Sequence, residues 1–487
     1  MNRRRFLSSM GRGGTAAIIY PPANVVLSGH SFVAGADATR LGITDHASRI
    51  KNSLDPKIFT FTAIGHGGYR TGHVGDGSGN QLFPLAPTEI DPLRKAGQLN
   101  FLLYEEVINS IGWYQSGPGG ALDSGPTTTL TISDMNAYFA ARRAAGWTPA
   151  NQSYIGACTM YPVAYFPAGP PSFPVTQDYR QSVRDVNTYV RGLTATDFLM
   201  AEFELDALTG HDPIDNRIYS SSDNLHPTDW GHQLYADRII RNIYAQYALR
   251  TGISLPWDPR LLGNIIFRYE ADRSSIVYTG DTHAVSAWSD KSTWAYDLSA
   301  SGAARPTWNA PNKSLDGAGA AAMTTALTAD LSFTSQLEAF AVYHCSSTGT
   351  IVVEYSPDYT SVSDAWALTG DVAGAPCIIA KGNVGLSNAI GVTFPGIKAV
   401  TFLLDNTKSS GQGDILIDGV EATATRIDAP NANALGKYKL SVFGRAGGSL
   451  GSTMQLDTLL VFSAPLSSVD RAQLISWAYN RRAQWAG

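Results

Sequence analysis

The pattern of apolar residues changes once along this 487-residue chain, near residues 250–263, and the change limits the folds available to it. Before this stretch, short runs that look like buried strands alternate with segments of helical periodicity. Such alternation predicts parallel βαβ units. After residue 263, short β-branched or aromatic runs are separated by clusters of Gly, Asn, Asp and Ser, which predicts an all-β sandwich.

These patterns predict two folded domains, as the length of the chain also favours. We expect an N-terminal basic arm or signal-like segment over residues 1–23, an α/β domain over 24–250, a linker over 251–262 and a β-sandwich over 263–487. Inside the α/β domain, we expect strands over 25–27, 58–64, 101–108, 153–160 and 198–205, and helices over 39–54, 133–145, 178–191 and 229–250. A long loop is expected over 110–129, and a closing helix over 469–482.

Composition excludes some classes of function. Hydrophobic residues make up 44% of the chain, charged residues 16%, and the net charge is −5, which argues against a nucleic-acid partner. No apolar run approaches the roughly 18 residues of a membrane span. The segment Asn2–Leu7 resembles a twin-arginine export signal, but Arg12 interrupts the apolar stretch that such a signal needs, so signal and retained arm both stay open. The expected location is extracellular, either by secretion or on a phage-like particle.

The cysteines and histidines do not form a metal motif. Cys158 sits in an apolar run, while Cys345 and Cys377 lie in one later region, and the sequence leaves open whether they pair. The spacing of His30, His66 and His73 matches no zinc motif. We therefore expect neither a metal nor another cofactor.

The first candidate for chemistry is Ser31. The apolar run Val25–Leu27 ends at Gly29 and His30, so Ser31 stands on the turn after a predicted strand. In open α/β sheets, ligands bind at the carboxyl ends of the strands. The alternative is that Ser31 is only a turn or N-cap residue.

The second candidate is the pair Asp223 and His226, followed by Pro227. A serine needs a base to take its proton, and the base needs an acidic partner on its other ring nitrogen. Asp223 and His226 on one loop can supply both if they meet Ser31. The alternative is a turn Asp and a polar loop His.

Together the two segments resemble the SGNH (GDSL-like) hydrolase family. Its first block, a Gly-x-Ser after the first strand, is matched by Gly29-His30-Ser31. Its last block, Asp-x-x-His-Pro before a glycine and a helix, is matched by Asp223, His226, Pro227 and Gly231. The resemblance covers residues 24–249 and implies a flavodoxin-like, three-layer domain with a parallel sheet.

The family's middle blocks are matched less completely. The glycine that donates a backbone N–H to the oxyanion corresponds to Gly68, with Gly67 as second choice, and the side-chain donor to Asn109. The glycine and aspartate that normally flank this asparagine are absent, and His30 replaces the usual Asp. The resemblance implies acyl transfer, in which His226, held by Asp223, activates Ser31, and the N–H groups of Ser31 and Gly68 with the Asn109 amide hold the oxyanion.

The C-terminal half resembles the concanavalin-like (laminin-G-like) sandwich group, through segments 285–292, 305–307, 439–445 and 459–462. This implies a jelly-roll sandwich that often binds glycans. Trp288, Trp294 and Trp308 are candidates for a sugar-stacking platform, and core packing is the alternative for each.

The two resemblances together predict a carbohydrate esterase that removes O-acetyl groups from a polysaccharide, with the sandwich holding the polymer near the site. The alternative is a polysaccharide-binding spike or fibre of a phage-like particle with a weak or repurposed hydrolase domain. Under either interpretation, the expected partner is a polysaccharide or acetylated glycan, and further copies of the chain or virion proteins are the other candidates. The sequence gives neither the sugar nor the acyl group.

Overall fold

The fold is described from a computed structural model of the chain. Residues 1–19 lie outside the described residues. Whether the segment expected over residues 1–23 is an export signal or a retained basic arm is therefore not tested. The structure describes residues 20–72, 80–116, 124–160, 165–166, 173–174, 177–203, 225–279, 282–292, 294–312, 314–319, 321–345, 350–356, 364–370, 376–380, 384–389, 397–408, 412–422, 424–425, 434–445, 451 and 453–483.

The first domain is built on a five-stranded parallel sheet with the order β2-β1-β3-β4-β7. This is the doubly wound, flavodoxin-like order, in which the chain reverses direction across the sheet between β1 and β3. The α/β fold and its parallel sheet are therefore as expected. The strands are β1 (Ala23–Gly29), β2 (Phe59–Gly65), β3 (Leu99–Glu105), β4 (Ser153–Cys158) and β7 (Phe198–Ala201).

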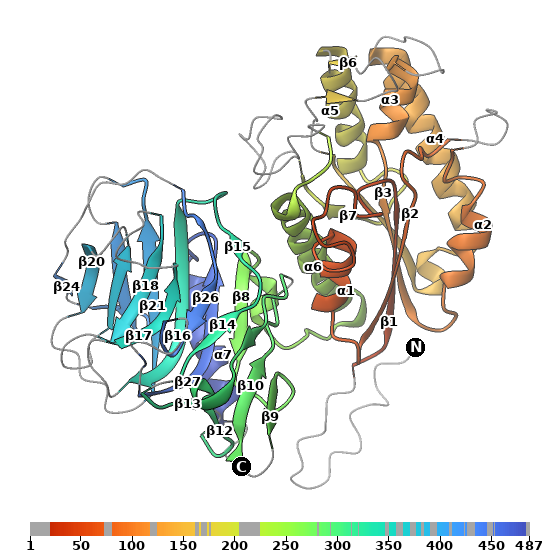
Figure 1. Ribbon diagram of the computed structural model, residues 1–487. Coiled ribbons are helices and arrows are strands. Elements are labelled where there is room, and N and C mark those ends of the chain that lie inside the picture. Colours follow the sequence, from red (N-terminus) through yellow and green to blue (C-terminus); the bar gives the residue numbers. More distant parts are fainter. Residues whose placement is uncertain are drawn as a thin grey trace, which may run out of the picture.

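Helices cover both faces of this sheet. Figure 1 shows α1 and α6 between the sheet and the second domain, with α3, α4 and α5 on the other side. The helices are α1 (His46–Ser53), α2 (Ala86–Glu89), α3 (Ile108–Ser116), α4 (Ser124–Ala144), α5 (Gln177–Arg191) and α6 (Asp229–Thr251), and a small hairpin pairs β5 (Tyr165–Phe166) with β6 (Phe173–Pro174).

The prediction of a long loop over residues 110–129 is wrong, because α3 occupies the first part of this range and α4 begins within it. The helix expected to begin at residue 133 therefore begins nine residues earlier, and Ser133 lies inside α4. The Thr-rich start of α4 has modest helix propensity, yet Thr127 and Thr131, four residues apart, are fully buried. Packing of this face outweighs the local propensity that the sequence interpretation relied on.

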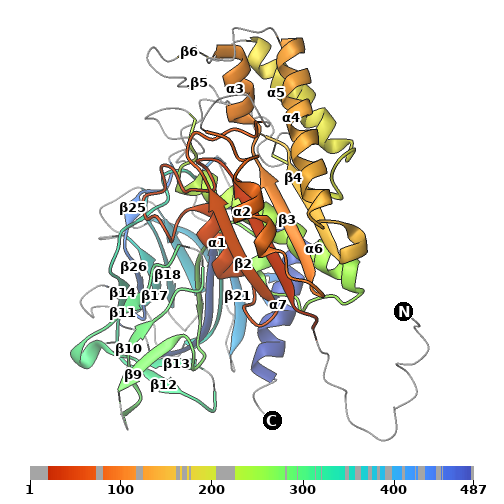
Figure 2. The ribbon, with the colours of Figure 1, turned by 90° about the vertical axis from the view of Figure 1, so that its right-hand side faces the viewer.

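The second domain is a large antiparallel β-sandwich, which Figure 2 shows below and to one side of the α/β domain. The long strands β16, β21, β27 and β8 pair in the order β21-β16-β27-β8. The finer expectation of a jelly-roll connection stays a prediction. The strands are β8 (Ile265–Glu270), β9 (Ile276–Thr279), β10 (Ala284–Trp288), β11 (Leu298–Ser299), β12 (Thr307–Asn309), β13 (Ser314–Gly317), β14 (Met323–Thr325), β15 (Ala329–Asp330), β16 (Gln336–Cys345), β17 (Thr350–Tyr355), β18 (Trp366–Gly370), β19 (Pro376–Ala380), β20 (Val384–Ala389), β21 (Lys398–Asp405), β22 (Gly413–Ile417), β23 (Val420–Glu421), β24 (Ala424–Thr425), β25 (Lys437–Tyr438), β26 (Leu440–Val442) and β27 (Met454–Phe462).

The chain closes with α7 (Ser468–Ala483), close to the helix expected there. Its buried Leu474 and Ala478 pack on β16 and β27, against Phe340 and Leu460 among others. Among the described helices, none has the length and apolar character needed to cross a membrane.

Candidate active site

Ser31 lies at the carboxyl edge of the parallel sheet, just after the inner strand β1, whose seven residues are all buried. The turn that carries it is tightly packed. A Cβ on Gly29 would lie 2.4 Å from the carbonyl oxygen of Glu105, and one on Gly65 would lie 2.4 Å from the nitrogen of Ala34. Glycine at these two positions lets β2, β3 and the serine turn approach one another.

The structure brings His226 to Ser31. The Nε2 of His226 lies 2.9 Å from the Oγ of Ser31, within hydrogen-bond distance. His226 stands three residues before α6, whose N-cap Thr228 accepts a hydrogen bond from the backbone N–H of Gly231. For His226 to accept the serine proton at Nε2, the ring must carry its own proton on Nδ1.

Asp223, the expected partner of that Nδ1, lies outside the described residues. Its role in orienting His226 therefore stays a prediction. Phe32 also helps to hold the His226 ring, because the two rings meet edge to face with centroids 5.8 Å apart.

His30, which replaces the Asp of the family pattern, lies beside the serine. It is 1% exposed, and its Nδ1 is 3.4 Å from the Ser31 Oγ. Burial lowers the pKa of His30 to about 3, with added repulsion from His226 and His46. His30 is therefore neutral at pH 7, and it adds no charge next to the nucleophile.

The two other oxyanion candidates lie in adjoining segments at the same sheet edge. Gly68 sits in an exposed turn with φ of +74°, and Gly67 is exposed beside it. The Asn109 amide, at the start of α3, donates to the carbonyl oxygen of Tyr69 at 2.8 Å. Asn109 thus fastens the turn that contains Gly68, and its direct action on an oxyanion stays a prediction.

Glu106 follows β3 directly and is fully buried. Its buried carboxylate accepts hydrogen bonds from the backbone N–H and hydroxyl of Thr71, at 2.9 and 2.5 Å, and from the Ser110 hydroxyl at 2.7 Å. Burial raises the pKa of Glu106, and these hydrogen bonds lower it in part. Glu106 therefore ties the segment after Gly68 to α3.

A buried chain of polar side chains beneath the serine turn was not foreseen from the sequence. Glu105 bonds His46 at 3.1 Å, His46 bonds His232 at 3.1 Å, and His232 bonds the carbonyl oxygen of Ala36 at 3.0 Å. Burial, with the nearby His46, lowers the pKa of His232 well below its usual value. This chain connects β3, α1 and α6 to the loop after Ser31.

A pocket of about 640 Å³ lies between the two domains. Residues 39–40 and 228–230 of the α/β domain form one wall, and the sandwich forms the other. Across it, Trp230 of α6 stacks on Phe333 with centroids 4.5 Å apart. The lining residues are Thr39, Arg40, Thr228, Asp229, Trp230, Trp294, Tyr296, Leu327, Thr328, Asp330, Ser332 and Phe333.

The three tryptophans expected to stack on sugars are buried in the structure, at 0% exposure for Trp288, 4% for Trp294 and 6% for Trp308. The Trp288 indole N–H donates to the Glu270 carbonyl oxygen at 3.0 Å, as expected of a core residue. Trp294 alone borders a described pocket, and Arg49 lies 4.3 Å over its ring. A sugar-binding role for these residues stays a prediction.

Whether Cys345 and Cys377 form a disulfide stays open. Cys345 is buried, and the side chain of Cys377 lies outside the described residues. Within the part of the chain that the structure describes, no group of three or more His, Cys, Asp or Glu is arranged to hold a metal ion.

No protein-family model matches the chain, and no curated protein matches it. Among solved structures, a Trypanosoma rangeli sialidase is similar at 11% identity and a TM-score of 0.32, over 50% of this chain and 38% of its own. The CBM40 of a Ruminococcus gnavus IT-sialidase, bound to α2,3 sialyllactose, is similar at 14% identity and a TM-score of 0.25, over 34% of this chain and 97% of its own. A structure of botulinum neurotoxin type C, whose cell entry depends on interaction with two ganglioside molecules, is similar at 10% identity and a TM-score of 0.31, over 44% of this chain and 51% of its own.

The chain spans only 33 to 40% of the length of the sialidase structures. The predicted enzyme class, an SGNH-type carbohydrate esterase, is wrong by this comparison, because the enzymes named among the similar structures are sialidases. That prediction rested on two short motifs. Such motifs place a nucleophile and a base, but they do not define the bond that is attacked.

Proposed function

We propose that the α/β domain carries a serine-nucleophile site, with Ser31 as nucleophile and His226 as its base, in a protein that binds glycans. The observation that supports this proposal most directly is the 2.9 Å distance between the His226 Nε2 and the Ser31 Oγ. Nucleophile and base within hydrogen-bond reach, at the switch point of a doubly wound sheet, are the arrangement that covalent catalysis requires.

The chemistry that such a pair supports is substitution through a serine-bound intermediate. As the Ser31 Oγ bonds to an electrophilic carbon, its proton passes to the His226 Nε2, and His226 then protonates the departing group as its bond breaks. Water attacks the intermediate and gives a proton to His226, which returns it to the Ser31 Oγ as the bond to the serine breaks.

Glycan binding is proposed from the sandwich and from the pocket beside the site. The pocket combines aromatic rings with the polar Arg40, Asp229 and Asp330, a lining suited to a sugar ring with hydroxyl groups. The stacked Trp230 and Phe333 at its edge add apolar surface of the kind that packs on the C–H face of a sugar. An extracellular location, where such glycans occur, belongs to the same proposal.

A second candidate is a glycan-binding protein whose serine site does not turn over. The observation that favours it is the Asn109 amide, which donates to the Tyr69 carbonyl oxygen instead of standing open at the oxyanion position. Without that donor, the rate is expected to fall by about 10² to 10³.

Turnover of p-nitrophenyl acyl substrates by the wild type and by Ser31→Ala separates the two candidates. Release that disappears in Ser31→Ala supports catalysis. Glycan binding by a wild type that releases nothing supports the second candidate. Cleavage of a methylumbelliferyl sialoside that persists in Ser31→Ala would contradict the first.

A further inference from the structure

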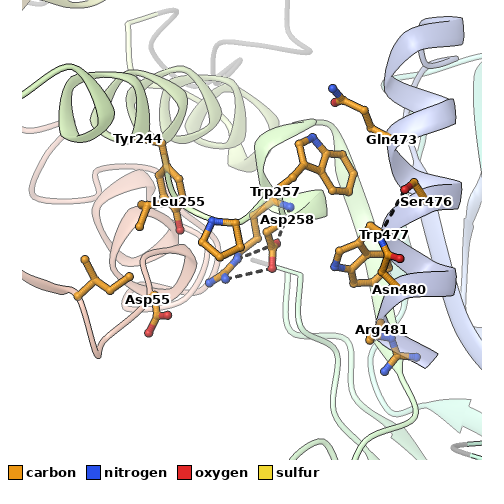
Figure 3. A pocket seen from close by; sticks show the side chains of 13 residues that line it. Asp55, Tyr244, Leu255, Trp257, Asp258, Gln473, Ser476, Trp477, Asn480 and Arg481 are labelled. Atoms are coloured by element: carbon orange, nitrogen blue, oxygen red, sulfur yellow. Dashed lines mark hydrogen bonds and ion pairs between the residues drawn. The ribbon is translucent and has the colours of Figure 1, made fainter. Parts of the chain in front are cut away.

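A second pocket, of about 550 Å³, lies between the linker and α7, and we call it the linker pocket. Figure 3 shows side chains from α6, the linker and α7 facing one another across it. Its lining residues are Asp55, Ile58, Tyr244, Leu255, Pro256, Trp257, Asp258, Arg260, Gln473, Ser476, Trp477, Asn480 and Arg481.

The linker pocket is separate from the serine site. The carbonyl oxygen of Ile58, in its wall, accepts a hydrogen bond from the backbone N–H of Ala23, the first residue of β1. Ser31 follows the other end of that seven-residue strand. A strand rises about 3.3 Å per residue, so the two sites are roughly 20 Å apart, at opposite edges of the sheet.

One face of α7 supplies much of the wall. Gln473, Trp477 and Asn480 recur at helical spacing, and Leu474 and Ala478 on the neighbouring face are fully buried against the sandwich. This spacing places the Trp477 ring between two amide side chains.

Two tryptophans form the apolar part of the linker pocket. Trp257 and Trp477 are both half-buried and meet edge to face, with centroids 6.4 Å apart. Within the described residues, neither indole N–H donates a hydrogen bond, and the Gln473 side chain makes none. These groups are available to a ligand with an apolar face and polar edges.

The two arginines that line the linker pocket are already paired with carboxylates of the protein. Arg260 pairs with Asp258 at 2.9 Å, and Arg481 pairs with Asp457. Burial raises the pKa of Asp258, but Arg268 and Arg260 outweigh it, so that the pKa is held below its usual value and the carboxylate stays charged. An anionic ligand would therefore find no unpaired cation among these residues.

We propose that the linker pocket binds a neutral sugar residue of a polysaccharide. A pyranose has an apolar C–H face that packs on an indole, and hydroxyl groups that amides and hydroxyls bind. The volume lies within the usual range for small-ligand sites. A polymer held here and at the serine site would be bound at both edges of the α/β domain, which raises its effective concentration at Ser31.

Calorimetric titration of the full chain with cellohexaose, xylohexaose, mannohexaose and maltohexaose tests the proposal, with α2,3-sialyllactose as the charged comparison. We expect at least one neutral hexasaccharide to bind, and the double variant Gln473→Ala, Asn480→Ala to weaken it at least tenfold. Both side chains are exposed, so this variant keeps the fold. Trp477→Phe should weaken binding less than Trp477→Ala.

Val469→Ala is the matched control, because Val469 is an exposed residue of α7 outside the linker pocket. It should bind as the wild type does, and so should Ser31→Ala, which separates this proposal from the one for the serine site. Failure of all four neutral hexasaccharides to bind, or binding that the double variant leaves unchanged, would overturn the proposal.

Discussion

The Nε2 of His226 lies 2.9 Å from the Oγ of Ser31, although the two residues are 195 positions apart in the sequence. The turn after β1 brings one of them to the sheet edge, and the segment before α6 brings the other. Tight packing around Gly29 and the buried contacts between α1 and α6 hold these two segments together. Substitutions in these segments therefore test how the site is supported as well as what it does.

Gly29→Ala should destabilise the α/β domain by about 2 kcal/mol or more. The added methyl would lie 2.4 Å from the Glu105 carbonyl oxygen and 2.6 Å from Val33, where backbone must move to admit it. Chemical denaturation measures the loss. Gly67→Ala is the matched control, because a Cβ there meets nothing within 4 Å, and equal stability of the two variants would contradict the packing argument.

His30 should make the protein sensitive to acid between about pH 6.5 and pH 3. Its pKa is lowered from 6.5 to about 3 in the folded state, so the unfolded state binds the proton first as the pH falls through 6.5. Stability is then complete above pH 6.5 and declines by up to about 1.4 kcal/mol per pH unit below it.

Unfolding free energies of the wild type and of His30→Asn, compared at pH 7.5 and pH 5, isolate this effect from other titrating groups. We expect His30→Asn to lose up to about 2 kcal/mol less than the wild type over that interval. An identical pH dependence in both proteins would show that His30 is not held neutral by burial.

Trp230 and Phe333 should couple the stabilities of the two domains. Their rings stack with centroids 4.5 Å apart and planes at 15°, one on α6 and the other on the sandwich. A double-mutant cycle with Trp230→Ala and Phe333→Ala should give a coupling energy of about 0.5 to 1.5 kcal/mol. Additive effects of the two substitutions would mean that the stack contributes nothing between the domains.

Much of the fold could be predicted from the sequence because its signals are local. The apolar run Val25–Leu27 and the periodicity over residues 229–250 predicted β1 and α6, which the structure has at Ala23–Gly29 and Asp229–Thr251. The start of α4 was missed because burial of Thr127 and Thr131, and not propensity, makes that segment helical.

The site could be predicted only in part, for a related reason. The motifs around Ser31 and His226 are readable in one sequence, and the structure brings the two together. The contacts of Glu105, His46 and His232 join three elements and leave no pattern within any one of them. The expected enzyme class was wrong because the motif residues alone do not report the bond attacked.

Covalent labelling with a fluorophosphonate probe, followed by mass spectrometry, tests the central claim most directly, because the probe reacts with a serine only when a neighbouring base activates it. The account predicts a single adduct on Ser31 of the folded wild type, and none on Ser31→Ala or His226→Ala of equal thermal stability. A folded wild type that remains unlabelled, or an adduct that persists in Ser31→Ala, would contradict it.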